Sequence, residues 1–200
     1  MSQHQMHMLT DRQLVDLVLA GDMHAFRRMV EMTERLVAQI VNKLIQIEED
    51  RKDVAQDVYL KAFQNLKGFR FQSKLSTWLG QIAYNTCLNR LKKKQLSIYG
   101  PLERVAGGLE DDMRYDHFRA VDETDRLLLQ KELKGLLEAE IGRLPPIYQT
   151  LIGLYHQEAL SYQEITRITG LPEGTVKSYL FRARRELKDS MLSRYKKEKL

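Results

Sequence analysis

The stretch LSYQEITRITGLPEGTVKSYLFRARR, residues 160–185, decides how the C-terminal part of the chain folds. Ser161 and Glu164 form a capping box at a helix start, and Gly170 suits the left-handed position that ends a helix. Pro172 then suits the first turn of a second helix, which is rich in Lys and Arg. A short helix, a turn with glycine and a basic second helix together predict a helix-turn-helix.

The second helix of this motif has an apolar side and a basic side. At 100° per residue, the apolar side is formed by Val176, Leu180, Ala183 and Leu187. A phenylalanine on the basic side has no folding role there, whereas a thymine methyl or a sugar offers it an apolar partner. The alternative, a helix that is merely solvated, stays open, as does the division between base and phosphate contacts. The candidate contacts to duplex DNA are Thr175, Lys177, Ser178, Phe181, Arg182 and Arg185.

Apolar residues recur at helical spacing through the rest of the chain. Such segments cover residues 10–20, 22–44, 48–68 and 76–94, and continue over 127–144 and 147–154. No run of alternating β-branched residues predicts a strand, and no internal repeat is visible. The fold class is therefore predicted to be all-α.

Local signals predict where the N-terminal helices begin and what they bury. We expect Thr10 with Gln13 to cap the first helix, and Ser73 or Ser76 to cap the fourth. In the third helix we expect Phe63 to be buried with the other apolar residues of the 54–66 stripe.

The fourth predicted helix carries a second stripe, separate from its apolar side. The stripe consists of an aromatic ring and amides among lysines, at helical spacing: Lys74, Trp78, Gln81, Asn85, Asn89 and Lys92. Rings stack on unpaired bases, amides bind base edges and ammonium groups bind phosphates, so the stripe favours contact with single-stranded nucleic acid. The alternative for Trp78 is a core residue at the helix start.

Charge is distributed in blocks along a chain of 200 residues with a net charge of +5. Residues 70–95 hold six basic and no acidic side chains, and residues 161–200 hold ten basic against five acidic. Residues 101–125, between them, hold eight acidic against three basic. We expect two domains that each face a polyanion, joined by an acidic linker; the alternative is ordinary solvated faces.

Several classes of protein are excluded or disfavoured. No apolar run is long enough to span a membrane, and the first residues do not form a signal peptide, so we expect a cytoplasmic protein without membrane insertion. The single cysteine, Cys87, excludes an internal disulfide and paired-cysteine zinc sites. No phosphate loop, nucleotide fingerprint or nucleophile elbow is present, so we expect no enzyme, cofactor or metal. His4 and His7 could bind a metal, although a frayed terminus explains them better.

Three signatures resemble the extracytoplasmic-function (ECF) class of bacterial RNA polymerase sigma factors, in the sigma-70 family. They are DVAQDVYLKAF at 53–63, similar to region 2.2, LSTWLGQIAYN at 75–85, similar to regions 2.3 and 2.4, and the 160–185 stretch, similar to region 4.2. The resemblance covers nearly the whole chain. It implies region 2 at 10–95, an acidic flexible linker at 96–126 and region 4 at 127–195.

The resemblance also implies partners and site residues. Core RNA polymerase would bind the region 2.2 helix through Asp53, Gln56, Asp57 and Lys61, although these side chains could also only solvate a surface helix. Region 4 would bind the minus-thirty-five element as a duplex, through the contacts named above. Region 2 would hold the melted minus-ten element through the stripe and Phe69. An anti-sigma factor is a candidate partner, and the alternative function is a free-standing helix-turn-helix transcriptional regulator.

Overall fold

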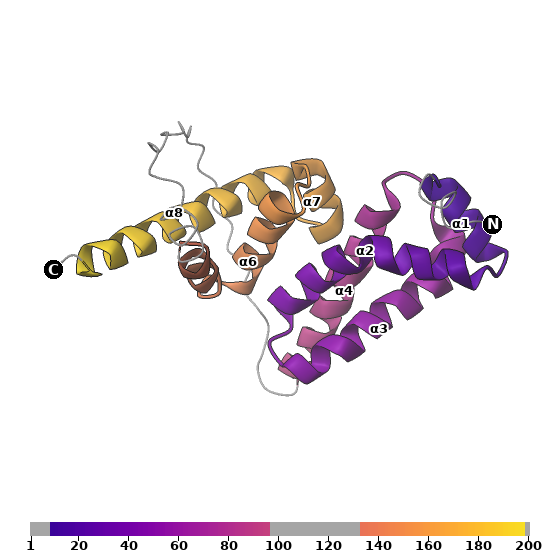
Figure 1. The fold of residues 1–200 in the computed structure, drawn as a ribbon, viewed down its shortest axis with the longest axis horizontal. Helices are drawn as coiled ribbons and strands as arrows, with labels where there is room; N and C mark the ends of the chain where they lie inside the picture. Colours follow the sequence, from indigo (N-terminus) through magenta and orange to yellow (C-terminus); the bar gives the residue numbers. More distant parts are fainter. Residues whose placement is uncertain (1–8, 97–132, 199–200) are drawn as a thin grey trace, which may run out of the picture.

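The computed structural model describes residues 9–96 and 133–198, which contain helices and turns but no strand (Figure 1). This confirms the all-α prediction. Beyond Leu96, the predicted linker lies outside the described residues. In chain order the elements are α1 (Asp11–Leu19), α2 (Met23–Leu44), α3 (Glu48–Asn65), the short turn η2 (Leu66–Gly68), α4 (Leu75–Leu96), a helix over 133–141, α6 (Pro146–Ile152), the π-helical turn η3 (Gly153–Gln157), α7 (Tyr162–Thr169) and α8 (Glu173–Glu198).

Short-range capping signals start the first two helices, the first of them as predicted. Thr10 and Gln13 form a reciprocal capping box at α1. At the start of α2, the Asp22 carboxylate accepts the N–H groups of His24 and Ala25 at 2.8 and 3.1 Å. These bonds satisfy amides that have no partner within their helices.

The start of α4 differs from the prediction. The helix begins at Leu75, and the N–H of Leu75 donates to the Asp11 carboxylate of α1 at 2.7 Å. A carboxylate suits the positive end of the helix dipole better than a neutral hydroxyl does. The expected caps, Ser73 and Ser76, do not fill this role, and the Ser73 hydroxyl instead donates to the Lys74 carbonyl.

The N-terminal half (residues 9–96) and the C-terminal half (residues 133–198) share one hydrophobic core. Figure 1 shows α6 and α7 lying against α2 and α4, and these pairs of helices are in contact. Leu36 and Ile40 of α2 are buried in the same cluster as Leu154 and Ile168 of the other half. The sequence analysis predicted two domains, but it did not predict that the C-terminal half would pack against the N-terminal half.

A second core holds the far end of the N-terminal half together, where α1 packs on α2 and η2 and buried residues of α3 and α4 join the cluster. Val54, Val58 and Ala62 are the buried residues of α3. Phe63, predicted to be buried, is 47% exposed, which corrects that prediction. It lies at the edge of the helix, where its ring meets Phe26 edge-on at 5.3 Å.

Candidate nucleic-acid interface

Helix α8 presents its basic side outward because its apolar side is fully used in packing. Val176, Leu180 and Ala183 are completely buried and Leu187 is 9% exposed, as predicted. The direction of α8 is set by α7, which Ser161 and Glu164 cap reciprocally at its start, and by the turn between the two helices, in which Gly170 adopts φ +71°. A residue with a side chain is strained at that φ.

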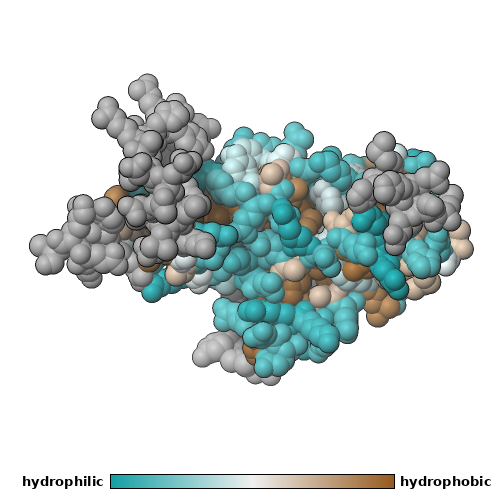
Figure 2. Space-filling view, in the orientation of Figure 1, coloured by the Kyte–Doolittle hydropathy of each residue, from teal (hydrophilic) through white to brown (hydrophobic). Residues whose placement is uncertain are grey.

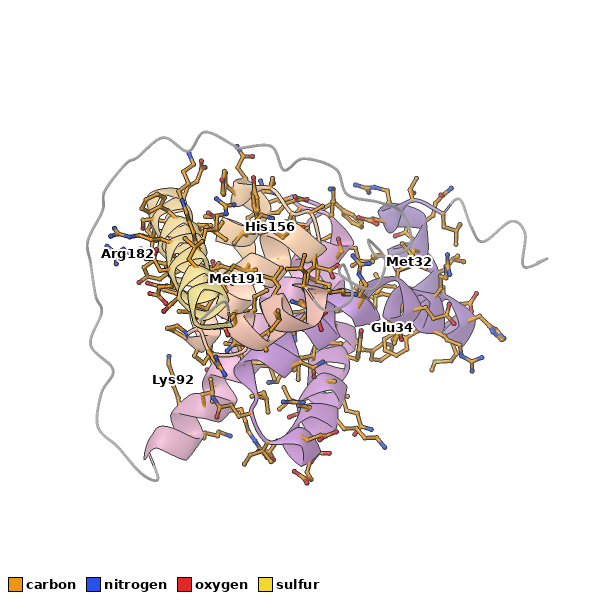
Figure 3. All side chains as sticks on the ribbon, turned by 60° about the vertical axis from the view of Figure 1, so that its left-hand side comes forward. Met32, Glu34, Lys92, His156, Arg182 and Met191 are labelled. Atoms are coloured by element: carbon orange, nitrogen blue, oxygen red, sulfur yellow. The ribbon has the colours of Figure 1, made fainter. Side chains whose placement is uncertain are left out.

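The predicted duplex contacts lie along the outer side of α8. Lys177 and Arg185 are exposed, and the other four are half-buried: Thr175, Ser178, Phe181 and Arg182. Figure 3 shows Arg182 projecting from α8 away from the body of the molecule. The side chain of Phe181 belongs to neither hydrophobic core, which agrees with a surface role.

Two exposed cations of α8, Lys177 and Arg185, pair with carboxylates of the same helix. Lys177 pairs with Glu173 at 2.8 Å and lies 5.4 Å from the Tyr162 ring centre, and Arg185 pairs with Asp189 at 3.9 Å. Exposed pairs of this kind contribute about 0.3–0.5 kcal/mol. A phosphate can therefore replace these carboxylates at small cost.

The stripe on α4 is exposed almost along its whole length. Trp78 is half-buried and the remaining members are exposed: Lys74, Gln81, Asn85, Asn89 and Lys92. In Figure 3, Lys92 stands on α4 below α8. The Trp78 ring packs on Phe69 with centroids 5.1 Å apart, as the core alternative expects, and the residue is only partly buried, so contact with a base stays a prediction.

A pocket of about 350 Å³ opens beside the start of this stripe. Phe69 is only 6% exposed, so it forms a wall of the pocket and supports Trp78 rather than projecting into solvent. The size suits one unstacked base, and the ring, amides and cation are the groups that bind bases and phosphates. The lining residues are Gly68, Phe69, Arg70, Gln72, Ser73, Thr77, Trp78, Gln81 and Arg167.

The loop and the first turn of α4 contact the C-terminal half at this pocket. Lys74 Nζ lies 2.9 Å from Glu164 Oε1, and Arg167 Nη1 donates to the Gln72 carbonyl at 2.8 Å. The hydrogen bond from Lys74, followed by one from the Ser161 N–H, lowers the pKa of Glu164 to about 2. The same contact with Glu164 raises the pKa of Lys74.

The predicted polymerase contacts lie on α3. Asp53, Gln56 and Asp57 are exposed on one side of the helix. Lys61 is half-buried and turns toward α4, where its Nζ donates to Thr86 Oγ1 at 3.2 Å. The structure thus separates Lys61 from the three other side chains of the set.

Sequence reasoning missed an apolar part of the same face. Leu60 is 55% exposed and lies seven residues after Asp53, hence on the same side of α3. Phe63 flanks it, and hydrophobic residues interrupt the hydrophilic surface in the right-hand half of Figure 2. The sequence signal that could have indicated this apolar part is Leu60 itself, a leucine at a position that the helical period assigns to the polar side of α3.

Within residues 9–96 and 133–198, no helix is long and apolar enough to cross a membrane. The same residues contain no group of three or more side chains suited to holding a metal ion. The terminal histidines discussed above, His4 and His7, lie outside the described residues.

Comparisons with known proteins agree with this arrangement. Residues 29–96 match the family described as "Sigma-70 region 2", and residues 134–187 match "Sigma-70, region 4". The chain is 35% identical over 186 residues to the ECF RNA polymerase sigma-E factor of Haemophilus influenzae, covering 92% of this chain and 96% of that one. Identity to the ECF RNA polymerase sigma-E factor of Escherichia coli K12 is 33% over 182 residues, covering 88% and 91%.

Two solved structures share the fold. One is CnrH in complex with the cytosolic domain of CnrY, with TM-score 0.59 and 21% identity, covering 92% of this chain and 97% of that one. The other is the sigma factor RpoE in complex with the anti-sigma factor NepR from Bartonella quintana, with TM-score 0.58 and 21% identity, covering 82% and 94%.

Proposed function

Because the chain belongs to the ECF class of RNA polymerase sigma factors, we propose that it holds a promoter at two places, as paired strands on α8 and as parted strands on α4. It is a transcription initiation factor. It acts in the cytoplasm and contributes no catalytic group of its own, since the polymerase performs the chemistry. Region 2 spans residues 10–95 and region 4 spans residues 127–195, with residues 96–126 as the linker.

The observation that carries the proposal is the exposed stripe of α4 beside a base-sized pocket. Parting the strands and unstacking a base costs a few kcal/mol per step. Stacking on an aromatic ring returns about 1–3 kcal/mol per base, and Trp78 supplies such a ring. Asn85 and Gln81 offer amides to base edges, and Lys74 and Lys92 offer ammonium groups to phosphates.

Helix α8 supplies the contact with the minus-thirty-five element. Its length of 26 residues and its outward basic side suit insertion into a major groove. Arg182 and Lys177 donate to guanine edges or phosphates, Ser178 donates to either, and Phe181 packs on a thymine methyl or a sugar. Thr175 and Arg185 lie at the two ends of this side of α8 and bind the sugar-phosphate backbone of the DNA.

Core polymerase binds the exposed side of α3. Asp53, Gln56 and Asp57 provide polar contacts around Leu60, whose exposed side chain is buried by the polymerase. An apolar anchor within a polar rim is the usual organisation of a protein interface. An anti-sigma factor that covers the same side would compete with the polymerase.

The free-standing regulator is the weaker alternative. It accounts for residues 160–187 but gives no role to the stripe of α4 or to residues 29–96, which match sigma-70 region 2.

Gel filtration of the full chain with bacterial core polymerase tests the proposal. We expect the wild-type chain to elute with the polymerase and the Asp53→Ala/Asp57→Ala variant to elute alone. Glu48→Ala is the matched control, because Glu48 is an exposed acid of α3 that lies 140° around the helix from Asp53. A wild-type chain that never co-elutes would contradict the proposal, and equal loss in the control would remove the α3 face from it.

A further inference from the structure

Helix α1 holds the rim of the pocket beside α4 at two adjacent points. We use the word rim for the non-helical segment 69–74 between η2 and α4. Arg12 Cζ lies 4.4 Å from the centre of the Phe71 ring, and the Asp11 carboxylate accepts the N–H of Leu75, just after the rim, at 2.7 Å. Figure 1 places α1 at the end of the molecule away from α8, so both contacts lie within the N-terminal half. Two neighbouring side chains of α1 thus fix the middle and the end of the rim.

Phe71 has a backbone conformation that its side chain disfavours. Its φ is +56°, in the left-handed region, where a bulky residue is strained. Glycine adopts this φ without strain, and asparagine tolerates it. A phenylalanine at such a position needs contacts of its ring to offset the strain, and strain of this kind is found mainly at functional sites.

The Phe71 ring belongs to a row of packed groups that leads from α1 to the pocket. Its centroid lies 4.7 Å from that of Phe69, and the Phe69 centroid lies 5.1 Å from that of Trp78. Phe69 and Trp78 line the pocket, whereas Phe71 is not among the lining residues. Phe71 therefore acts on the pocket through its neighbours and would not touch a bound base.

The left-handed turn at Phe71 shapes the rim around the pocket. Two rim residues on each side of Phe71 line the pocket: Phe69 and Arg70 before it, and Gln72 and Ser73 after it. An extended segment would turn alternate side chains away, so the chain has to curl at Phe71 for all four to reach the pocket. Within the part of the chain that the structure describes, no N–H of residues 70–74 donates to a backbone carbonyl. Side-chain contacts therefore hold this shape.

We propose that Phe71 and Arg12 are positioning residues for the melted strand, which keep the rim curled so that the pocket is ready to take an unstacked base. This inference rests on the proposed function. A site that is ordered during folding binds more tightly than one that must be ordered when the ligand arrives. The proposal adds α1, which lies outside the 29–96 match to sigma-70 region 2, to the parts of the chain that capture the strand.

The alternative is that Phe71 only fills the second core, against which its ring packs. A residue of that kind would affect the pocket only as far as it affects the stability of the fold. Base capture and stability therefore have to be measured on the same variants.

Substitutions at two positions separate these roles. F71G frees the backbone and removes the ring, F71N tolerates the left-handed backbone without the ring, and F71Y keeps the ring. R12A removes the guanidinium from the Phe71 ring. R27A is its matched control, because Arg27 is an exposed arginine of α2 and its loss changes the net charge equally.

Base capture is measured as a ratio of two affinities. Fluorescence anisotropy compares a pool of random 12-nucleotide strands with an abasic strand of the same length, each bound by the full chain in complex with core polymerase. Both strands carry the same phosphates, so the ratio isolates the contribution of the bases. Core polymerase alone gives the background ratio, and urea unfolding of each free variant gives its stability.

In the wild type we expect a ratio well above that of core polymerase alone. In F71G, F71N and R12A the ratio should fall about three- to tenfold, and in F71Y and R27A it should stay at the wild-type value. R12A decides between the two roles, because it removes an exposed side chain and should leave the urea midpoint unchanged.

Three results would overturn the inference and leave the proposed function intact. They are a wild-type ratio in R12A or F71G, an equal fall of the ratio in R27A, and a ratio that simply follows the urea midpoint through the series. A wild-type ratio no higher than that of core polymerase alone would overturn the proposed function as well.

Discussion

Asp11 caps α4 from another helix, and removing this carboxylate should loosen the start of the DNA-binding stripe. The Leu75 N–H donates to Asp11 at 2.7 Å in a partly buried setting. Loss of a helix cap costs about 1 kcal/mol, and loss of a charge at the positive end of a helix about 0.5 kcal/mol more. D11A should therefore lower the free energy of unfolding by about 1.5 kcal/mol.

Urea unfolding followed by circular dichroism measures this effect. With an m-value of about 2 kcal/mol/M, the midpoint of D11A should fall by about 0.75 M. D11N keeps the hydrogen bond and loses the charge, so its urea midpoint should fall by only about 0.25 M. D16A, a change at an exposed acid of the same helix, should leave the midpoint unchanged.

The same variants test the link from the cap to function. A fluorescent base in the minus-ten region should show reduced opening with D11A and near-normal opening with D11N, although Asp11 itself touches no DNA. If D11A were as stable as the wild type, or if D11N fell as far as D11A, the capping argument would be refuted.

Three further variants probe the core, the duplex contact and the domain contact. L151A should destabilise the chain by about 2–5 kcal/mol in urea, because Leu151 is completely buried; a loss below 1 kcal/mol would contradict its place in the shared core. R182A should weaken binding to promoter duplex by about 1–3 kcal/mol, or lower by about 1 the slope of the log binding constant against log salt concentration; no change in either would remove Arg182 from the interface. The pKa of Glu164, about 2 in the folded chain, should rise in K74A when followed by NMR titration, and an unchanged value would exclude the Lys74 contact. Since this pKa lies below the ordinary value of 4.5, the contact stabilises the fold fully above about pH 4.5, and this stabilisation is lost as the pH falls toward 2. E164Q has no carboxylate to protonate, so its stability should not show this loss.

The elements that depend on neighbouring residues could be predicted from the sequence. The Ser161–Glu164 capping box spans three positions, and Gly170 ends α7 by its own backbone conformation. The buried side of α8 follows from the helical period alone. The stripe of α4 was predicted for the same reason, since its members share one side of a single helix.

Features that join distant residues could not be predicted in this way. The cap of α4 comes from Asp11, 64 positions away, and a serine close to the helix start was the reasonable local choice. Gly80 gave no sign that Ile168 would fill the space beside it. Glu164 was identified as a cap of its own helix, but its bond to Lys74 depends on docking of the two halves.

Exposure at helix edges was the other source of error. Phe63 lies between the buried and the polar side of α3, and the helical period alone does not decide which way such a residue turns. The family resemblance places Lys61 with Asp57 in the polymerase-binding set, and this assignment stays a prediction; the hydrogen bond of Lys61 to Thr86, which turns it toward α4, joins residues 25 positions apart and could not be predicted from the helical period.

Transcription reconstituted from purified components tests the central claim most directly. Core polymerase free of sigma factors, a pool of DNA with random upstream sequence and the full chain should yield start sites preceded by two enriched elements, one near minus ten and one near minus thirty-five. The account predicts that these starts vanish when the chain is omitted. Start sites identical with and without the chain would contradict it.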